Sequence, residues 1–365
     1  MDMNRRTVMT AGVAASMFAM LPRGAMAAFS PAPDGWHKFE ITTRIALPAT
    51  TEAAQIWVPL PAVDEAGWMT PGATDWTTNA DRAEIVTNPD NGVAMLHAEW
   101  DAGTSDKVLD LVNTISAQGR DTDLTQPGQT PELSAQERTL YTSATALIPT
   151  DGLVKETSDK ITAGADSDLE KARLIYDWIV ENTARNPETR GCGLGDVASM
   201  LAVGDLTGKC ADLNSLYVGL ARAAGLPSRD VYGLRVAKSA FGYKSLGAGS
   251  PDVTKAQHCR AEVFLDGFGW VAVDPADVRK VMLEEPPKDL ALDDPKVVDA
   301  RAALFGGWEG NWIAYNFAHD VVLPGSDNGA VEFLMYPQAE VAGERFDPLD
   351  MDRRYYTITA RELTA

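Results

Sequence analysis

The sequence contains few cysteines and few histidines. In 365 residues there are three cysteines (Cys192, Cys210 and Cys259) and four histidines. No Cys-x-x-Cys pair occurs, so the paired ligands of a structural zinc site are missing. No Asp-x-Asp-x-Asp-Gly loop occurs either, and this excludes a helix–loop–helix calcium site. We therefore expect neither a metal ion nor a cofactor.

Positive charge and long apolar runs are also scarce. Lys and Arg number 32 against 52 Asp and Glu, which gives a net charge of −20. Such an excess of negative charge repels phosphate groups, so nucleic acid and anionic membrane surfaces are excluded as partners. Beyond the first 27 residues no segment is apolar enough to span a membrane, and we expect no membrane insertion.

Residues 1–27 have the layout of an export signal. Arg5 and Arg6 form a twin-arginine pair, residues 10–21 are apolar, and Ala25-Met26-Ala27 is a small-residue cleavage site. The arginine pair favours the twin-arginine (Tat) route, although an ordinary secretory signal fits the same layout. We expect a periplasmic or secreted mature protein. Removing three arginines and one aspartate brings its net charge to −22, from −20 − 2.

The remaining chain divides by pattern into four parts. Residues 28–117 alternate apolar and polar side chains, which predicts an N-terminal β domain. Residues 118–149 are polar at first and contain prolines, as expected of a connection. Residues 150–283 begin with helical patterns and end in strands. Residues 284–365 start as an acidic, proline-containing surface excursion and return to strand-like runs, which predicts a C-terminal β extension packed on the core.

Cys210 follows a glycine-rich stretch and opens a helical pattern. The predicted helix runs from Cys210 to Ala224 and stops at Gly225. A cysteine nucleophile must be a thiolate, and a helix N-terminus and a neighbouring imidazole both lower a thiol pKa. The alternative for Cys210 is a buried, inert thiol, because free cysteines are among the most often buried residues.

His258 begins one strand of a predicted hairpin and Asp274 ends the other. The turn lies at residues 266–269, so antiparallel pairing brings the two side chains together at the open end of the hairpin. Asp274 can then hold one ring nitrogen of His258 and leave the other facing Cys210. Nucleophile, base and orienting carboxylate are the three parts of a catalytic triad.

These stretches together resemble the transglutaminase-like superfamily. The matching motifs, in the family's order, are Gly208-Lys209-Cys210, Gly225-Leu226-Pro227-Ser228-Arg229, His258 with Glu262-Val263, Gly269-Trp270-Val271 and Asp274-Pro275. Residues 172–182 resemble the helix that precedes the cysteine helix, and Trp57-Val58-Pro59-Leu60-Pro61 resembles the β-unit found before the core in many bacterial members. Arg260 departs from the pattern, since an aromatic residue or alanine is usual two positions after the histidine.

The resemblance implies an α+β fold with a papain-like transglutaminase core at 150–283. It implies Cys210 as nucleophile, His258 as base and Asp274 as orienting carboxylate, acting on peptide or isopeptide amides of a peptide or protein substrate through a thioester. Hydrolysis, as in a cysteine peptidase or amidase, is favoured over amine cross-linking. Three alternatives remain: a protein-glutamine transglutaminase, a cell-wall peptide amidase, and a non-catalytic peptide-binding or assembly module.

The residues left over support secondary predictions. A disulfide between Cys192 and Cys259 would clamp the glycine-rich loop to the histidine strand and leave Cys210 free; two reduced thiols are the alternative. The glycine-containing loop at 238–257 is a candidate lid over the site. Arg229 is expected to be structural, and Asp212 to interact only with the helix dipole.

Overall fold

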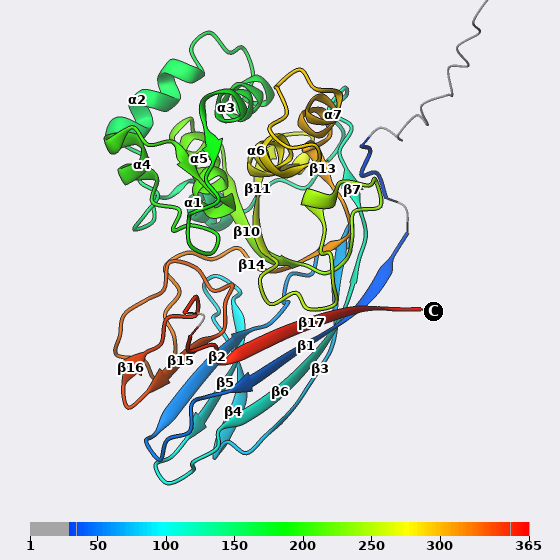
Figure 1. The fold of residues 1–365 in the computed structure, drawn as a ribbon. Helices are drawn as coiled ribbons and strands as arrows, with labels where there is room; N and C mark the ends of the chain where they lie inside the picture. Colours follow the sequence, from blue (N-terminus) through cyan, green and yellow to red (C-terminus); the bar gives the residue numbers. More distant parts are fainter. Residues whose placement is uncertain (1–28, 34, 351, 365) are drawn as a thin grey trace, which may run out of the picture.

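The structure is a computed structural model that describes residues 29–33, 35–350 and 352–364 (Figure 1). The predicted export signal at 1–27 lies outside these residues. No helix in the described ranges combines the length and the apolar character that crossing a membrane requires.

Residues 37–117 form the first six strands, which belong to two antiparallel sheets. In β1, for example, every second side chain from Phe39 to Ile45 is buried, which places one face toward the core. The strands are β1 (His37–Ala46), β2 (Ala54–Pro59), β3 (Met69–Thr78), β4 (Arg82–Thr87), β5 (Ala94–Trp100) and β6 (Val108–Ala117). Buried side chains of β1 and β6 share one core with those of β2 and β5, so the two sheets pack as a sandwich.

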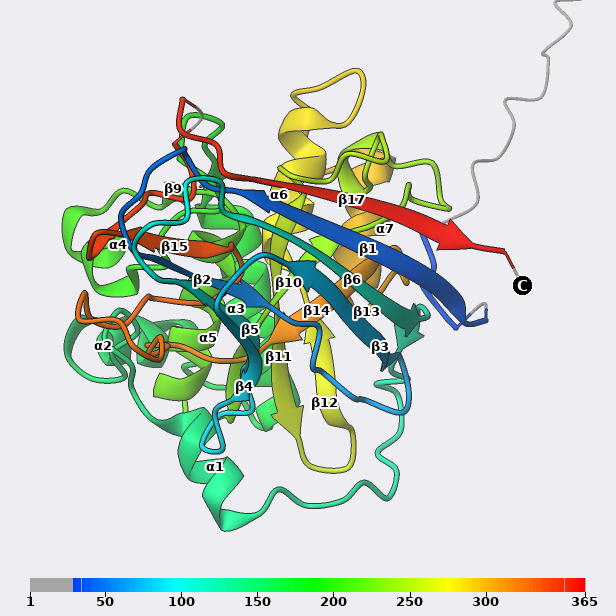
Figure 2. The same cartoon turned by 90° about the horizontal axis from the view of Figure 1, so that it is seen from below.

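Both sandwich sheets are completed from the other end of the chain. Strand β17 (Tyr356–Leu363) pairs with β1, giving the order β17-β1-β6-β3, and the four strands lie side by side in Figure 2. Strands β15 (Gln338–Val341) and β16 (Glu344–Arg345) extend the other sheet, in the order β16-β15-β2-β5-β4. Residues 284–365, grouped by their sequence as one extension, are therefore shared among all three large sheets.

The third large sheet has the order β14-β10-β11-β12-β13-β7. Its central strands are fully buried, because helices cover one face and the sandwich covers the other. The strands are β7 (Arg120–Asp121), β10 (Ser228–Arg235), β11 (Gln257–Leu265), β12 (Gly269–Val273), β13 (Phe305–Trp308) and β14 (Trp312–Asn316). The predicted hairpin at 258–274 is the β11–β12 pair.

Seven α-helices and one short 3₁₀ helix occur in the described residues. They are α1 (Ala135–Thr142), α2 (Gly152–Ile161), α3 (Asp168–Asn182), α4 (Val197–Val203), α5 (Cys210–Ala223), η1 (Lys244–Leu246), α6 (Pro275–Glu284) and α7 (Pro295–Ala303). The sequence pattern predicted α3 and α5 but not the shorter helices, and it interpreted the segment that holds α7 as a surface excursion. Every residue of α5 is buried, because the third sheet, α2, α3 and α6 all pack against it.

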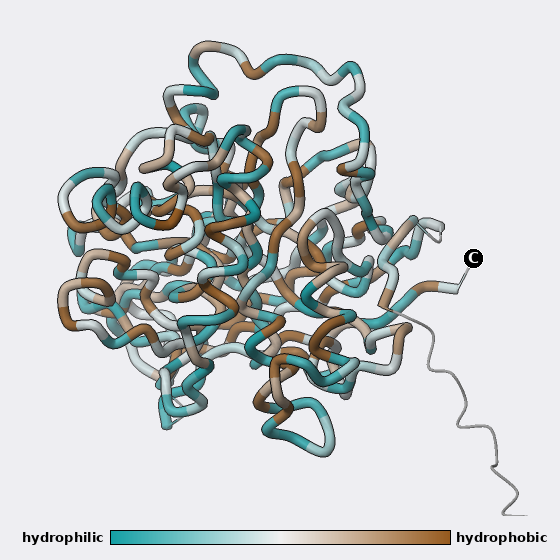
Figure 3. The backbone as a smooth tube through the Cα atoms, turned by 90° about the horizontal axis from the view of Figure 1, so that it is seen from above, coloured by the Kyte–Doolittle hydropathy of each residue, from teal (hydrophilic) through white to brown (hydrophobic). Residues whose placement is uncertain are grey.

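Two large apolar cores meet at the third sheet. One lies between this sheet and the helices, and the other continues from its opposite face into the sandwich. Figure 3 shows hydrophobic and hydrophilic stretches alternating along the backbone, as expected of strands and helices that bury one face. The mixed architecture agrees with the predicted α+β class and its N-terminal β-sandwich-like unit.

Candidate active site

Cys210 is the first residue of the buried helix α5. Its backbone N–H has no acceptor within the helix, and the positive end of the helix dipole lies at its thiol. The start of α5 is held by the preceding strand β9 (Thr207–Gly208), which pairs in parallel with β8 (Ala184–Arg185). Only 4% of Cys210 is exposed, so a substrate must reach the sulfur through a cavity.

The glycine-rich loop before α5 is shaped by a buried carboxylate, Asp212. Its oxygens accept hydrogen bonds from the backbone N–H groups of Lys209 (2.9 Å), Leu194 (3.0 Å) and Gly195 (3.1 Å). A Cβ at Gly193 would lie 1.9 Å from the Asp212 carboxylate, so only glycine fits there. Asp212 thus fixes both the loop and the helix start, a larger role than the dipole contact expected from the sequence.

His258 and Asp274 lie together at the open end of the hairpin, as its pairing predicts. The Nε2 atom of His258 is 2.8 Å from Oδ2 of Asp274. Asp274 is also the N-cap of α6, where its Oδ1 accepts from the backbone N–H of Asp277 at 3.0 Å. With Nε2 engaged in this way, Nδ1 of His258 is left for Cys210.

Sequence reasoning missed three buried side chains around this pair. Asn214 donates to Asp274 at 3.1 Å, and Asp277 lies 3.4 Å from Nε2 of His258. Arg235 in turn pairs with both oxygens of Asp277, at 2.6 and 2.8 Å. Signals for two of them were present: Asn214 follows Cys210 by four positions on one helix face, and Asp277 stands in the first turn after an Asp-Pro start.

Arg260, the departure from the family pattern, does not line the cavity. Its guanidinium stacks over the rings of Trp312 (4.6 Å) and Trp308 (5.0 Å), and its Nε is 3.6 Å from Oδ2 of Asp274. It therefore adds positive charge next to Asp274 and does not contribute to the cavity that leads to Cys210.

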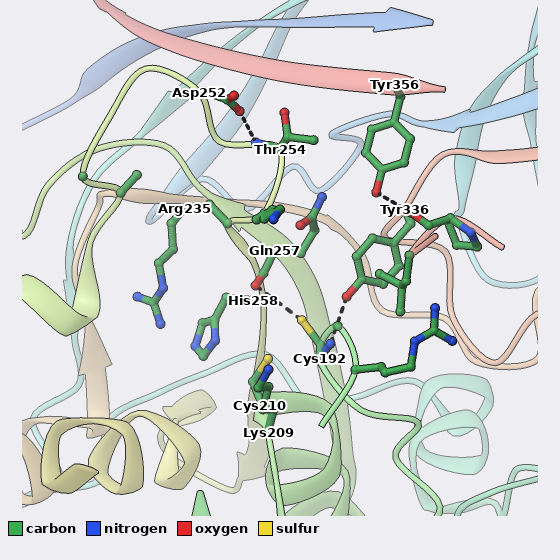
Figure 4. A pocket seen from close by; sticks show the side chains of 18 of the residues that line it. Cys192, Lys209, Cys210, Arg235, Asp252, Thr254, Gln257, His258, Tyr336 and Tyr356 are labelled. Atoms are coloured by element: carbon green, nitrogen blue, oxygen red, sulfur yellow. Dashed lines mark hydrogen bonds between the residues drawn. The ribbon is translucent and has the colours of Figure 1, made fainter. Parts of the chain in front are cut away.

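Cys210 and His258 line one cavity of about 590 Å³ (Figure 4). His258 and Arg235 lie on one side of Cys210, and Cys192 with Tyr336 on the other. The loop predicted as a lid supplies part of the wall. It is tied to β17 by hydrogen bonds from Val253 to Ile358 (2.9 Å) and from Ile358 to Thr254 (2.8 Å).

The electrostatics favour a thiolate–imidazolium pair. Burial raises the pKa of Cys210, but hydrogen bonds from Cys192 and Cys259 and the charge of His258 outweigh it, and the pKa of Cys210 falls well below its usual range. Burial and Arg235 lower the pKa of His258, while Asp277, Asp274 and the Cys210 thiolate outweigh them and raise it to about 9. At neutral pH the proton therefore resides on His258.

All three cysteines of the chain converge on this site. The sulfur atoms of Cys192, Cys210 and Cys259 lie within 4.8 Å of one another, all buried. The structure has three free thiols, so the expected disulfide between Cys192 and Cys259 is absent from it. These thiols could hold a soft metal ion, and His258, Asp274 and Asp277 form a second group within the same distance limit.

Arg229 lies in a structural ion-pair cluster, as expected. Its guanidinium donates to Glu262 at 2.6 Å and to Glu65 at 3.0 Å, and stacks on Phe317 at 3.6 Å. Glu262 is fully buried and also pairs with Arg120 from β7. The cluster ties strands β7, β10 and β11 of the third sheet to the segment between β2 and β3 of the sandwich.

Comparison with known proteins locates the family. The model of the transglutaminase-like superfamily matches residues 155–275, which include Cys210, His258 and Asp274. A Haemophilus influenzae protein described as "Uncharacterized protein" is 35% identical over 345 residues, covering 90% of this chain and 91% of the relative. The chain belongs to the transglutaminase-like superfamily.

One solved structure shows a similar fold over most of this transglutaminase-like chain. A crystal structure described as "a Putative Cysteine Protease" from Cytophaga hutchinsonii covers 90% of this chain and 99% of its own, with a TM-score of 0.50 and 14% identity. The periplasmic domain of TgpA from Pseudomonas aeruginosa covers 67% of this chain and 88% of its own, with a TM-score of 0.35 and 14% identity.

Proposed function

We propose that this protein is an exported, thiol-dependent enzyme that hydrolyses peptide or isopeptide amides. One observation carries the proposal: Cys210, at the start of a helix, shares a cavity with His258, whose Nε2 is held 2.8 Å from Asp274. A module that only binds peptides has no need of all three groups. The name of the Cytophaga hutchinsonii neighbour supports hydrolysis over cross-linking. The sequence of residues 1–27 supports export, with the Tat route favoured.

The reaction begins from the charged pair. The Cys210 thiolate attacks the carbonyl carbon of the amide, and a C–S bond forms while the carbonyl oxygen becomes negative. The C–N bond then breaks, and His258 gives its Nδ1 proton to the leaving amine. A water molecule next loses a proton to His258 and attacks the thioester, which releases a carboxylic acid and restores the thiolate. Asp274 holds the imidazole in orientation throughout.

The negative oxygen needs two hydrogen-bond donors. The backbone N–H of Cys210 is the first. For the second we assign Gln257, which lines the cavity next to His258. Its Nε2 is buried and has no hydrogen-bond partner among the described residues. A buried amide donor without a partner costs free energy, and an oxyanion would supply the missing acceptor.

The first test compares residues 28–365 as wild type, Cys210→Ala and His258→Ala on a fluorogenic peptide library. We expect cleavage by the wild type and none by Cys210→Ala. The rate of Cys210 alkylation by iodoacetamide at pH 6 should fall at least tenfold in His258→Ala, because the thiolate loses its counter-ion.

A parallel assay adds a fluorescent primary amine. Incorporation of the amine in place of hydrolysis would replace the peptidase assignment with a transglutaminase. Slow alkylation of Cys210 at every pH, with peptide binding but no turnover, would instead establish a binding module.

A further inference from the structure

The cavity around Cys210 is strongly cationic in a protein of net charge −20. Seven Lys and Arg residues line it, against two acidic residues, Asp252 and Asp350. A lining of this kind runs against the composition of the chain, so chance placement explains it poorly. Local fields in a cleft decide which charged groups bind there.

Three of the four arginines in the lining form ion pairs with carboxylates of the protein. Arg190 pairs with Asp347 at 2.7 Å, Arg235 pairs with Asp277, and Arg185 pairs with Glu284. These pairs leave little charge for a ligand. The fourth arginine of the lining, Arg354, lies on the segment leading to β17.

The three lysines are not neutralised in this way. Lys209, directly before the nucleophile, donates to the neutral backbone carbonyl of Thr189 at 2.6 Å. Lys280 lies 3.8 Å from Glu284, whose charge is already shared with Arg185. Lys255 is exposed at the cavity and forms no ion pair within 4.0 Å in the described residues, although the charge of Asp252 in the same lining acts on it. Three ammonium groups therefore surround the path to Cys210 without full counter-charges.

The charged form of Lys280 is destabilised by its position in the cavity. Burial and the nearby Arg235 lower the pKa of Lys280 to about 8, although Asp277 and Glu284 act against the shift. An anion bound next to its ammonium would restore the charged form. The site thus gains free energy from a ligand that brings negative charge.

We propose that the substrate is an acidic peptide whose carboxylates pair with Lys209, Lys255 and Lys280 on either side of the amide that Cys210 attacks. This inference rests on the proposed function, because it names the substrate class of the same cavity. Carboxylates fit this site better than phosphates do. The cations without a counter-charge are lysines, which act as separate point charges and lack the paired donors with which arginine binds phosphate.

The test measures binding in a Cys210→Ala background, where turnover cannot interfere. The probes are fluorescein-labelled (Glu-Gly)3 and (Gln-Gly)3, which match in length and shape and differ in having carboxylates or neutral amides. We expect (Glu-Gly)3 to bind at least tenfold more tightly, and Lys255→Glu to remove at least tenfold of that affinity. Lys160→Glu is the matched control, because Lys160 is an exposed lysine on α2 outside the cavity. The affinity of this variant for (Glu-Gly)3 should stay within twofold of that of the Cys210→Ala background.

Equal affinities for the two peptides, binding of neither, or an equal loss in Lys160→Glu would overturn the inference. Turnover assays on the wild type separate this failure from that of the proposed function. Cleavage without preference for acidic peptides keeps the enzyme and rejects the substrate class. Charge-selective binding without any turnover rejects the enzyme and keeps the ligand class.

The sulfur cluster carries a second, independent proposal. A metal bound to three thiolates at about 2.3 Å needs sulfur–sulfur distances of about 4.0 Å. The three sulfur atoms of the cluster lie within 4.8 Å of one another and need to close by at most about 0.8 Å to bind such an ion. A fourth soft donor is present, because Sδ of Met335 lies 4.0 Å from Sγ of Cys259.

We infer that Cys192, Cys210, Cys259 and Met335 form a binding site for a thiophilic cation of the Cu(I) type, which blocks the nucleophile. Thiolate and thioether donors together select Cu(I) over harder ions. Binding displaces the thiol protons of Cys192 and Cys259 to solvent and occupies the electron pairs of Cys210 that attack substrate.

Anaerobic titration with Cu(I) against bicinchoninate tests this site without any activity assay. We expect one Cu(I) per chain and at least tenfold weaker binding in Cys259→Ser and Cys192→Ser. Bound Cu(I) should also protect Cys210 from iodoacetamide until a chelator is added. Unchanged Cu(I) affinity in the Cys192→Ser/Cys259→Ser double variant would contradict this proposal. A chain mass lower by 2 Da, which indicates a disulfide, with no copper bound would contradict it as well.

Discussion

The chemistry of this site depends on a few single side chains whose charges are set by their neighbours. Asp277 is the least expected of them, because it adds a second carboxylate 3.4 Å from the His258 ring that Asp274 already holds. Its charge is balanced by Arg235 behind it. Two carboxylates around one imidazole keep the proton on His258 well above neutral pH.

The pH profile should reflect this arrangement. Activity rises as Cys210 loses its proton and falls as His258 loses its own, so the basic limb of kcat/KM is expected near pH 9. In Asp277→Asn, His258 loses a stabilising charge and Arg235 loses its counter-ion. Both effects lower the pKa of His258, and the basic limb should move down by about one pH unit or more. A profile unchanged from the wild type would remove Asp277 from this role.

Gln257 offers a second prediction at this scale. In Gln257→Glu, a donor is replaced by an acceptor of the same shape, and kcat for peptide hydrolysis should fall about 100-fold. Alkylation of Cys210 by iodoacetamide forms no oxyanion, so its rate should stay within threefold. A parallel loss in both reactions would mean that Gln257 supports the site only structurally.

At the scale of elements, the helix start and the glycine-rich loop act as one unit. Asp212 joins them through three backbone hydrogen bonds, and Gly193 passes so close that any side chain collides with the carboxylate. Helix α5 places Cys210 at the third sheet, and hairpin β11–β12 places His258 and Asp274 against it. The position of Cys210 therefore depends on the loop as much as on the helix.

Substitution of Gly193 tests this dependence. Gly193→Ala should lower the free energy of unfolding by about 2 kcal/mol or more and slow Cys210 alkylation, because the clash displaces Asp212. Gly204→Ala is the control: Gly204 has a similar positive φ of 75° but open space around it. Its cost should be only the conformational part, about 1 kcal/mol. Equal costs at both positions would show that the contact with Asp212 is unimportant.

At the scale of the whole molecule, the two ends of the chain are interleaved. Strand β17 pairs with β1 and is hydrogen-bonded to the wall of the cavity around Cys210, while β15 pairs with β2. One apolar core runs from the sandwich into the third sheet. The sandwich and the third sheet thus stabilise each other through a shared apolar core and through segments at both ends of the chain.

This interleaving predicts a single cooperative unfolding transition for residues 28–365. Calorimetric and van't Hoff enthalpies should agree, and the fragment 28–117 should show no cooperative melt, because β1 and β2 would each lose a neighbouring strand. Circular dichroism and scanning calorimetry measure both. A fragment that melts cooperatively by itself would establish the sandwich as an autonomous domain.

How far the sequence predicts the fold differs between these scales. Helix α5 and hairpin β11–β12 were predictable, because periodicity and turn signals are local. Strand β3 was not, since it contains Pro71 and Gly72 and buries little of its surface. The short helices α2 and α4 were missed because few of their residues are buried.

Local pattern was enough to select Cys210, His258 and Asp274 as candidates and to predict that the last two lie together, because a hairpin pairs residues close in sequence. Arg235 and Gln257 acquire their proposed roles only from tertiary contacts: each is an ordinary polar residue until the third sheet, α5 and α6 bring it next to the others. The same holds for the three sulfur atoms, the cationic cavity and the division of residues 284–365 among three sheets. Long-range packing decides which distant segments meet, and no local propensity encodes that choice.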